Sequence, residues 1–127
     1  MKTVAVDTNI ILRLLLADHP TLHEQARQMF SQAEGGKYKI YLDEVIVAEA
    51  VWVLDSFYKQ TKDKIVSILT QLLSQPWIIN PRKKLIMETL NIFNSQNLSY
   101  IDCWLLCLCQ NNRYTLKTLD RKLQKQT

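Results

Sequence analysis

The feature that most constrains the fold is an acidic residue at the junction between a predicted strand and a predicted helix. Val4 and Val6 alternate with smaller or polar neighbours, which is typical of a short strand, and Asp7-Thr8-Asn9 interrupts this pattern. From Ile10 onwards, apolar residues recur at helical spacing. Asp7 therefore stands at the carboxyl end of a strand, the edge of a parallel α/β sheet where ligands bind. The simpler alternative is that Asp7 or Thr8 only caps the following helix.

A second junction of the same kind lies near the end of the chain. Residues 115–119 are predicted to form a strand, and Asp120 follows it directly, before a short helix over 121–124. If this strand lies beside the first one, the two are ~4.8 Å apart and Asp7 and Asp120 nearly touch. Two carboxylates at that distance raise each other's pKa strongly unless a cation lies between them.

Strands and helices alternate along the whole chain, which predicts a parallel sheet with right-handed crossovers. Two more strands are expected at 38–42 and 77–79. The remaining helices are expected from Pro20 to the residue before Gly35, and then over 44–54, 61–73, 81–93 and 99–110.

Composition favours one compact, helix-rich domain over residues 1–127, with 47% apolar residues and only two glycines. The chain has sixteen basic and twelve acidic residues. If several of the acids lie together in one pocket, the rest of the surface is more basic than these totals indicate. Such a surface favours a polyanionic partner, for example a nucleic acid. The apolar stretch at the N-terminus is interrupted by Asp7 and Arg13 and is too short to span a membrane, so we expect a cytoplasmic protein.

The stretch 45–54 is apolar on every side apart from Glu49. Such a helix is expected to be buried all round, by its own domain or by a second subunit, and it therefore predicts a homodimer. Burial of an unpaired carboxylate costs on the order of several kcal/mol, so Glu49 should be protonated, paired with a cation or directed into a polar pocket. The alternative is that Glu49 reaches solvent at the helix edge.

Asp102 is, like Glu49, a lone charge beside a mostly apolar helix. Its spacing from Ser99 is that of a capping box, which offers a purely structural explanation. The same helix carries three cysteines, an odd number that argues against a disulfide framework. We expect them to be small core residues in a reducing compartment: Cys103, Cys107 and Cys109.

Other polar residues are weaker candidates. His19 and His23 are four residues apart but lack a third metal ligand, so we interpret them as solvated. Two basic clusters, 82–84 and 121–122, are interpreted as solvated faces, with contact to an RNA backbone as the alternative. Arg13 lies nearer to the predicted acidic pocket and is a candidate RNA contact.

Four short motifs, each on the element described above, occur in a fixed order along nearly the whole chain. They are Asp7-Thr8-Asn9, Val47-Ala48-Glu49, Tyr100-Ile101-Asp102 and Thr118-Leu119-Asp120-Arg121. No single motif is specific, but together they resemble a PIN domain, and more narrowly the VapC-type toxin of a type II toxin–antitoxin pair. The resemblance implies that four acids are the catalytic and metal-binding residues, Asp7, Glu49, Asp102 and Asp120, and that Thr8, Asn9 and Thr118 support them.

The fold implied is a single PIN-like α/β domain, with a central parallel sheet of four or five short strands flanked by helices. Three positions depart from the family pattern. Cys103 replaces the usual small residue, and Leu119 stands where an aromatic is common. Many relatives carry a further strand after the last acid, whereas this chain stops at Thr127, so the fifth strand is in doubt.

The resemblance and the donor set together imply a metal-dependent ribonuclease. A carboxylate cluster without His or Cys suits Mg²⁺ or Mn²⁺. Such ions would activate a water and stabilise the leaving oxygen during hydrolysis of an RNA phosphodiester. Asp7 and Asp102 are expected to bind the metal directly, while Glu49 and Asp120 complete the site through water or as a general base. The resemblance also implies a cognate antitoxin protein.

Two other functions stay open from the sequence. The chain would be a non-catalytic PIN-fold interaction module if it only holds a partner. It would be a metal-dependent hydrolase acting on DNA or another phosphate ester if the metal site accepts any phosphate.

Overall fold

Three short parallel strands form one sheet within residues 2–127, the part of the chain that the computed structural model describes. β1 (Thr3–Ala5) pairs with β2 (Lys39–Tyr41), and β2 pairs with β3 (Ile78–Ile79). Ile40 and Ile78 lie opposite each other and are fully buried, so the centre of the sheet is part of the core. The order β1-β2-β3 makes β1 one edge of the sheet, and its carboxyl end carries Asp7.

A helix follows each strand, and polar side chains cap most of the predicted helix starts. The helix predicted from residue 81 begins instead at Lys83, without a side-chain cap. The α-helices in the described chain are α1 (Thr8–Leu16), α2 (Pro20–Glu34), α3 (Glu44–Trp52), α4 (Lys62–Leu73), α5 (Lys83–Ser95), α6 (Tyr100–Asn112) and α7 (Arg121–Gln124). A π-helical turn, Val53–Phe57, continues α3. The side chains of Asp7, Asp43 and Ser99 accept hydrogen bonds from the first turns of α1, α3 and α6. No helix of residues 2–127 is long and apolar enough to cross a membrane.

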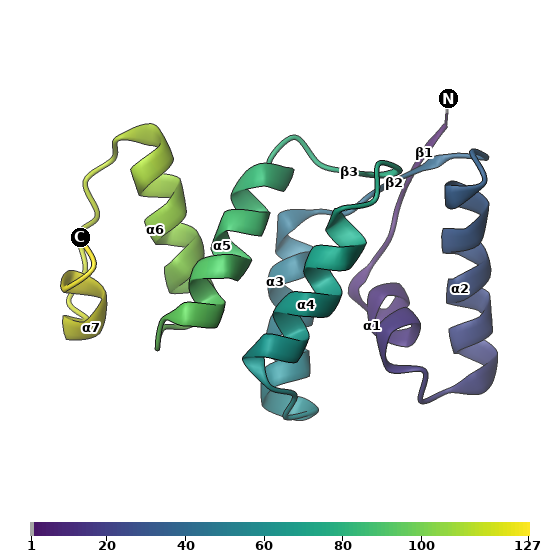
Figure 1. The fold of residues 1–127 in the computed structure, drawn as a ribbon, viewed down its shortest axis with the longest axis horizontal. Coiled ribbons are helices and arrows are strands. Elements are labelled where there is room, and N and C mark those ends of the chain that lie inside the picture. Colours follow the sequence, from purple (N-terminus) through teal and green to yellow (C-terminus); the bar gives the residue numbers. More distant parts are fainter. Residues whose placement is uncertain (1) are drawn as a thin grey trace.

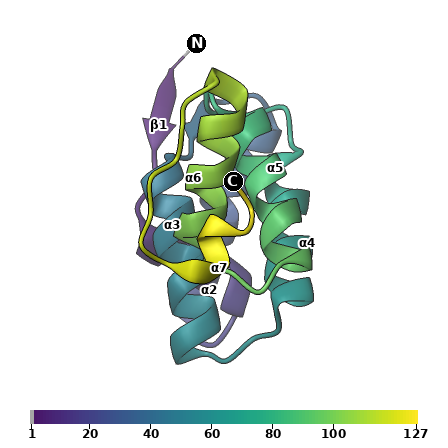
Figure 2. The same cartoon turned by 90° about the vertical axis from the view of Figure 1, so that its left-hand side faces the viewer.

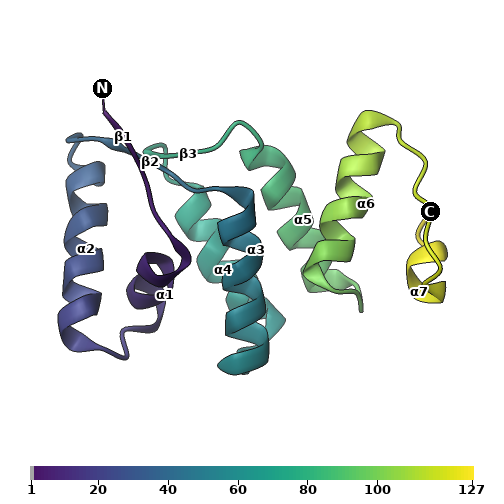
Figure 3. The ribbon, with the colours of Figure 1, turned by 180° about the vertical axis from the view of Figure 1, so that it is seen from behind.

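The elements are spread along one long axis of the molecule (Figure 1). The sheet, α1 and α2 lie at one end, α3 and α4 lie in the middle, and α5, α6 and α7 follow towards the other end. Figure 3, seen from behind, gives the same order. The first strand and the last helix are therefore at opposite ends.

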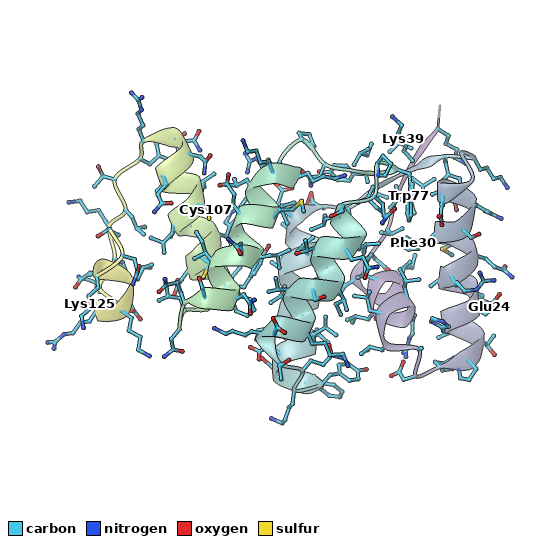
Figure 4. The ribbon with its side chains drawn as sticks, viewed as in Figure 1. Glu24, Phe30, Lys39, Trp77, Cys107 and Lys125 are labelled. Carbon is cyan, nitrogen blue, oxygen red and sulfur yellow. The ribbon has the colours of Figure 1, made fainter. Side chains whose placement is uncertain are left out.

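One apolar core runs through these layers. The sheet, α4 and α5 contribute fully buried residues such as Ile40, Leu69 and Ile86, and α3 and α6 contribute others. At the sheet end, Phe30 of α2 meets Trp77 edge-on with ring centroids 5.9 Å apart (Figure 4). At the other end, Cys107 lies buried in α6 beside α5, which confirms its predicted place in the core.

The predicted fourth strand over 115–119 is wrong for the described chain. α6 ends at Arg113 in the left-handed conformation, with φ of 58°, and the following segment runs back along the molecule to α7 (Figure 2). It pairs with no strand, and Leu119 is 98% exposed. The sequence pattern predicts a strand, but pattern alone does not supply the neighbouring strand that pairing requires, and the chain bends at Leu119.

The domain itself does not bury α3 all round. Burial of the remaining face by a second subunit stays a prediction. Val47, Ala50 and Val51 are buried, whereas Val45 and Trp52 are 68% and 65% exposed. The helix lies on the flank of the molecule and leaves an apolar face uncovered within residues 2–127.

Lys62 anchors the loop that leads into α6. Its ammonium group donates to the carbonyls of Gln96 and Leu98 at 2.9 and 3.4 Å, and it lies 4.5 Å from the centroid of the Phe93 ring. Lys62→Met keeps the apolar stem but removes these interactions. We expect the free energy of unfolding to fall by about 1–3 kcal/mol in urea titrations. Lys64→Met, on the exposed side of the same helix, is the control and should change it little; equal effects would contradict this role.

The buried thiols predict how stability depends on pH. Burial raises the pKa of Cys103 from 9.0 to about 11 and also raises the pKa of Cys107. Below pH 9 the thiols are mostly neutral in both the folded and the unfolded protein. Between pH 9 and 11 they ionise mainly in the unfolded chain. The free energy of unfolding should therefore decrease as the pH rises through that range, and less so in Cys103→Ala. At pH 8 iodoacetamide should label the thiols only in urea; rapid labelling of the folded protein would contradict their burial.

Candidate functional site

Asp7 lies where the sequence places it, at the carboxyl end of β1, and it also caps α1. Its Oδ1 accepts a hydrogen bond from the Ile10 N–H at 3.0 Å, so the capping explanation describes a real contact. The same carboxylate lines a groove of about 230 Å³ between α1 and α2, together with Asn9 and Arg13. The Arg13 guanidinium lies 3.3 Å from the Asp18 carboxylate at the rim. With Gln25, which also lines it, one acid, two amides and one cation border a single groove.

Thr8, directly after Asp7, is an unusual polar residue in this region. It is buried, and its hydroxyl has no hydrogen-bond partner in the described chain. A buried hydroxyl without a partner costs about 1–3 kcal/mol. The end of β1 therefore carries a polar atom whose hydrogen bonding the single chain leaves incomplete.

Glu49 lies on the exposed face of α3. Val45, Glu49 and Trp52 are spaced four and three residues apart, so they share one helix face, and all three are exposed. Of the two explanations for Glu49, the one in which the carboxylate reaches solvent therefore describes this chain. The Glu49 carboxylate needs no charged partner because water solvates it. Glu49 interrupts an otherwise apolar strip on this face of α3.

Asp102 and Asp120 both begin helices. The Ser99 hydroxyl accepts a hydrogen bond from the Asp102 N–H at 3.2 Å, so one half of the predicted capping box is present. Asp120 caps α7 by accepting from the Leu123 N–H at 3.0 Å, and its own N–H donates to the Thr118 hydroxyl at 3.0 Å. Thr118 therefore stabilises the local turn that leads into Asp120.

The described chain does not bring the four acids together. Across residues 2–127, no three acidic, histidine or cysteine side chains converge closely enough to hold a metal ion. Asp7 lies at the end of β1, whereas Asp120 begins α7 at the opposite end of the molecule (Figure 1). In this arrangement the carboxylates do not fit a metal site within one copy.

A polar cluster that the sequence analysis missed lies at the carboxyl ends of β2 and β3. The Asn80 amide donates to Glu44 Oε1 and to the Leu42 carbonyl, both at 2.9 Å. The Arg82 guanidinium lies 3.5 Å from the other Glu44 oxygen. The Tyr41 hydroxyl donates to Asp43 Oδ1 at 2.9 Å, and this hydrogen bond raises the pKa of Tyr41. The rule that identified Asp7, a polar residue directly after a strand, identifies Asp43 and Asn80 as well.

The cluster joins two strand ends to α3, and its groups satisfy one another. We therefore assign it a structural role. It also engages Arg82, and the neighbouring Lys83 donates to the Gln75 carbonyl at 3.0 Å. Burial lowers the pKa of Lys83. The basic cluster at 82–84 is thus partly used inside the protein, whereas Arg121 and Lys122 are exposed on α7.

His23 joins α2 to α1, which corrects its interpretation as solvated, whereas His19 is exposed, as that interpretation predicts. His19 Nδ1 accepts a hydrogen bond from the Leu22 N–H at 3.2 Å and so caps α2. His23 Nδ1 donates to the Arg13 carbonyl at 2.9 Å.

The comparisons with known proteins agree with the motif order. One curated relative, described as "VapC ribonuclease" from Aquifex aeolicus (strain VF5), is 21% identical over 98 residues, which is 77% of this chain and 72% of that protein. No solved structure matches the chain. The family model described as "PIN domain" matches residues 4–127, a range that contains all four acids. The chain therefore belongs to the PIN domain family.

Proposed function

We propose that this protein is an endoribonuclease of the VapC type, the toxin of a toxin–antitoxin pair that acts in the cytoplasm. The observation that carries the proposal is the PIN domain match over residues 4–127. In our interpretation the family's acidic motifs correspond to Asp7, Glu49, Asp102 and Asp120, all of which lie within the matched range. The relative described as a VapC ribonuclease supports the same function.

The proposed substrate is RNA, and the chemistry of the site supports this choice. Asp7 shares its groove with Arg13, which would bind a phosphate oxygen while the carboxylate lies beside it. The excess of sixteen basic over twelve acidic residues attracts a polyanion to the surface. The four acids offer oxygen ligands, which would favour Mg²⁺ or Mn²⁺ once they are assembled. Because one copy keeps them apart, we derive no catalytic step through a metal.

Asp7→Asn is the sharpest test of the ribonuclease function. Asn caps a helix about as well as Asp, so the free energy of unfolding should change by less than about 0.5 kcal/mol. Loss of the charge should lower cleavage of RNA by about 100-fold or more. Asp7→Ala should lose activity as well, together with about 0.5–2 kcal/mol of stability. Cleavage of structured RNA, single-stranded RNA and DNA in Mg²⁺ provides the measurement.

The matched control for this test is Asp63→Asn, in the exposed first turn of α4. It removes one surface carboxylate and should leave cleavage unchanged. Full activity of Asp7→Asn would refute the role of Asp7. Cleavage of DNA alone would identify a deoxyribonuclease, and binding of a partner without any cleavage would identify an interaction module.

The proposed antitoxin has a candidate binding surface on α3. Trp52 and Ile101 are exposed and border a groove of about 320 Å³, and Glu49 lies on the same face of α3 as Trp52. An apolar segment of a partner would cover the groove, and a Lys or Arg at its tip would reach the Glu49 carboxylate. Such a partner would block access to the acid as well as hide the apolar face.

Trp52→Ala tests this surface. A large exposed aromatic at an interface centre is typically a hot spot, so we expect the affinity for a small inhibitory protein purified from the native host to fall at least 30-fold. The free energy of unfolding should barely change, since Trp52 is 65% exposed. Tyr114→Ala, at a residue exposed to 62%, is the matched control. Unchanged affinity in a titration of Trp52→Ala would place the partner elsewhere.

A further inference from the structure

One face of α2 forms a wall of the groove beside Asp7. The α2 residues that line the groove recur at spacings of three and four positions, so they share one side of the helix: Leu22, Gln25, Ala26 and Met29. Ala26 is buried, whereas the larger Leu22 and Met29, one turn away on either side, are 37% and 38% exposed. A small side chain between two large ones therefore leaves a hollow with apolar sides.

α1 forms the opposite wall and carries the charged groups. The two helices pack against each other at one end of the molecule (Figures 1 and 3). Asp7 caps the start of α1, and Arg13 follows at a distance of about 9 Å along the helix axis, at a rise of about 1.5 Å per residue. A carboxylate and a guanidinium thus border the groove at separate points, with space between them for an uncharged group.

The uncharged polar groups of the groove are two amides, those of Asn9 and Gln25. Gln28, further along α2, lies outside the groove and donates to Glu24 at 3.5 Å, whereas Gln25 is exposed and borders the groove. An amide offers a hydrogen-bond donor and an acceptor side by side. Apolar walls with an amide at the edge fit a flat ring system that has polar atoms along its rim, which is the chemistry of a nucleobase.

The size of the groove also favours a single base over a segment of protein. Its volume is about 230 Å³. One turn of an α-helix, taken as a cylinder about 10 Å wide and 5.4 Å high, occupies about 420 Å³, so a helix does not fit inside. The Met29 thioether is adaptable and makes favourable contacts with aromatic rings. We propose that this groove binds one unpaired adenine of an RNA substrate, with Gln25 bonded to the edge of the base and Met29 against its face.

Adenine is the base whose edge matches an amide most directly. The Gln25 side-chain oxygen would accept from the adenine N6 amino group, while the amide nitrogen donates to adenine N7. On the same edge guanine presents two acceptors, N7 and O6, which leaves the Gln25 oxygen facing an acceptor. A pyrimidine has one ring instead of two and covers less of the apolar walls. The base has to be unpaired, because only an unstacked base can insert its ring between side chains.

Arg13 connects the base site to the proposed cleavage site. Its guanidinium lies 3.3 Å from one oxygen of Asp18, whose other oxygen accepts from the Tyr58 hydroxyl at 3.4 Å. The remaining N–H groups of Arg13 are available to a phosphate. One nucleotide would then bind with its phosphate on Arg13 and its base against Gln25, beside Asp7. The choice of RNA as the ligand rests on the proposed ribonuclease function.

Binding of short RNAs tests the site without any measurement of cleavage. The probes are a fluorescent uridine hexamer and three hexamers in which one uridine is replaced by A, G or C. Their affinities are measured by fluorescence anisotropy in EDTA, which removes divalent metals. The hexamer with A should bind about 5-fold or more tightly than the all-uridine hexamer, the lower end of what one bidentate contact supplies.

Gln25→Met keeps the length of the side chain and removes the amide. The preference for A over uridine should fall below about 2-fold, because the contact with the edge of the base is lost. Gln28→Met, the same change outside the groove, is the matched control and should keep the preference. Met29→Ala should weaken binding of the hexamer with A by about 2–10-fold, because it removes the contact with the ring face.

Several results would overturn the adenine site. They are equal affinity of the wild type for the four hexamers, binding of none of them, and a preference for A that Gln25→Met preserves. A preference for another base that Gln25→Met abolishes would overturn adenine as the ligand. If Gln25→Met weakens binding of the inhibitory protein and leaves the RNA affinities unchanged, the groove is a protein-docking surface and the proposal is wrong.

The same variants separate this inference from the proposed function. If the wild type cleaves RNA but its base preference does not depend on Gln25, the ribonuclease function stands and the adenine site is wrong. If Gln25 governs the preference but the wild type cleaves no RNA, the adenine site stands and the ribonuclease function fails.

Discussion

The parallel hydrogen bonds between β1 and β2 fix the position of Asp7, and the geometry of the candidate site depends on them. Three residues on each strand are paired, from Thr3 opposite Lys39 to Ala5 opposite Tyr41. The chain leaves this short strand directly into α1, so Asp7 has to stand at its end and cap the helix. Because β1 is also an edge, the interaction that holds Asp7 in place leaves the other side of the strand available for a partner.

Sequence patterns predicted the local elements well and the long-range arrangement only in part. Helix starts at Asp7, Asp43 and Ser99 follow from side chains that bond to their own backbone within three residues, so local sequence specifies them. The pairing of 115–119 depends instead on where α6 delivers the chain. The left-handed turn at Arg113 directs the chain away from β1. The sequence pattern of residues 115–119 contains no information about that turn.

The same limit applies to the site. The motif order identified the family, because the four acids keep their order along the chain and the family model covers residues 4–127. It did not determine which acids lie together in space. The sequence analysis missed the polar cluster around Asn80 and Glu44 because it searched for sites within the four motifs. The cluster also lies directly after strands, as Asp7 does, but it lies outside the four acidic motifs.

Electrostatics explains why a divided site is compatible with a stable single copy. Asp7, Glu49 and Asp120 are exposed in the described chain, so water solvates each charge and none has to be neutralised for the chain to fold. Once gathered around one point, the same carboxylates would repel one another and would each be harder to ionise unless a cation lay between them. Gathering them therefore requires a favourable contribution from elsewhere.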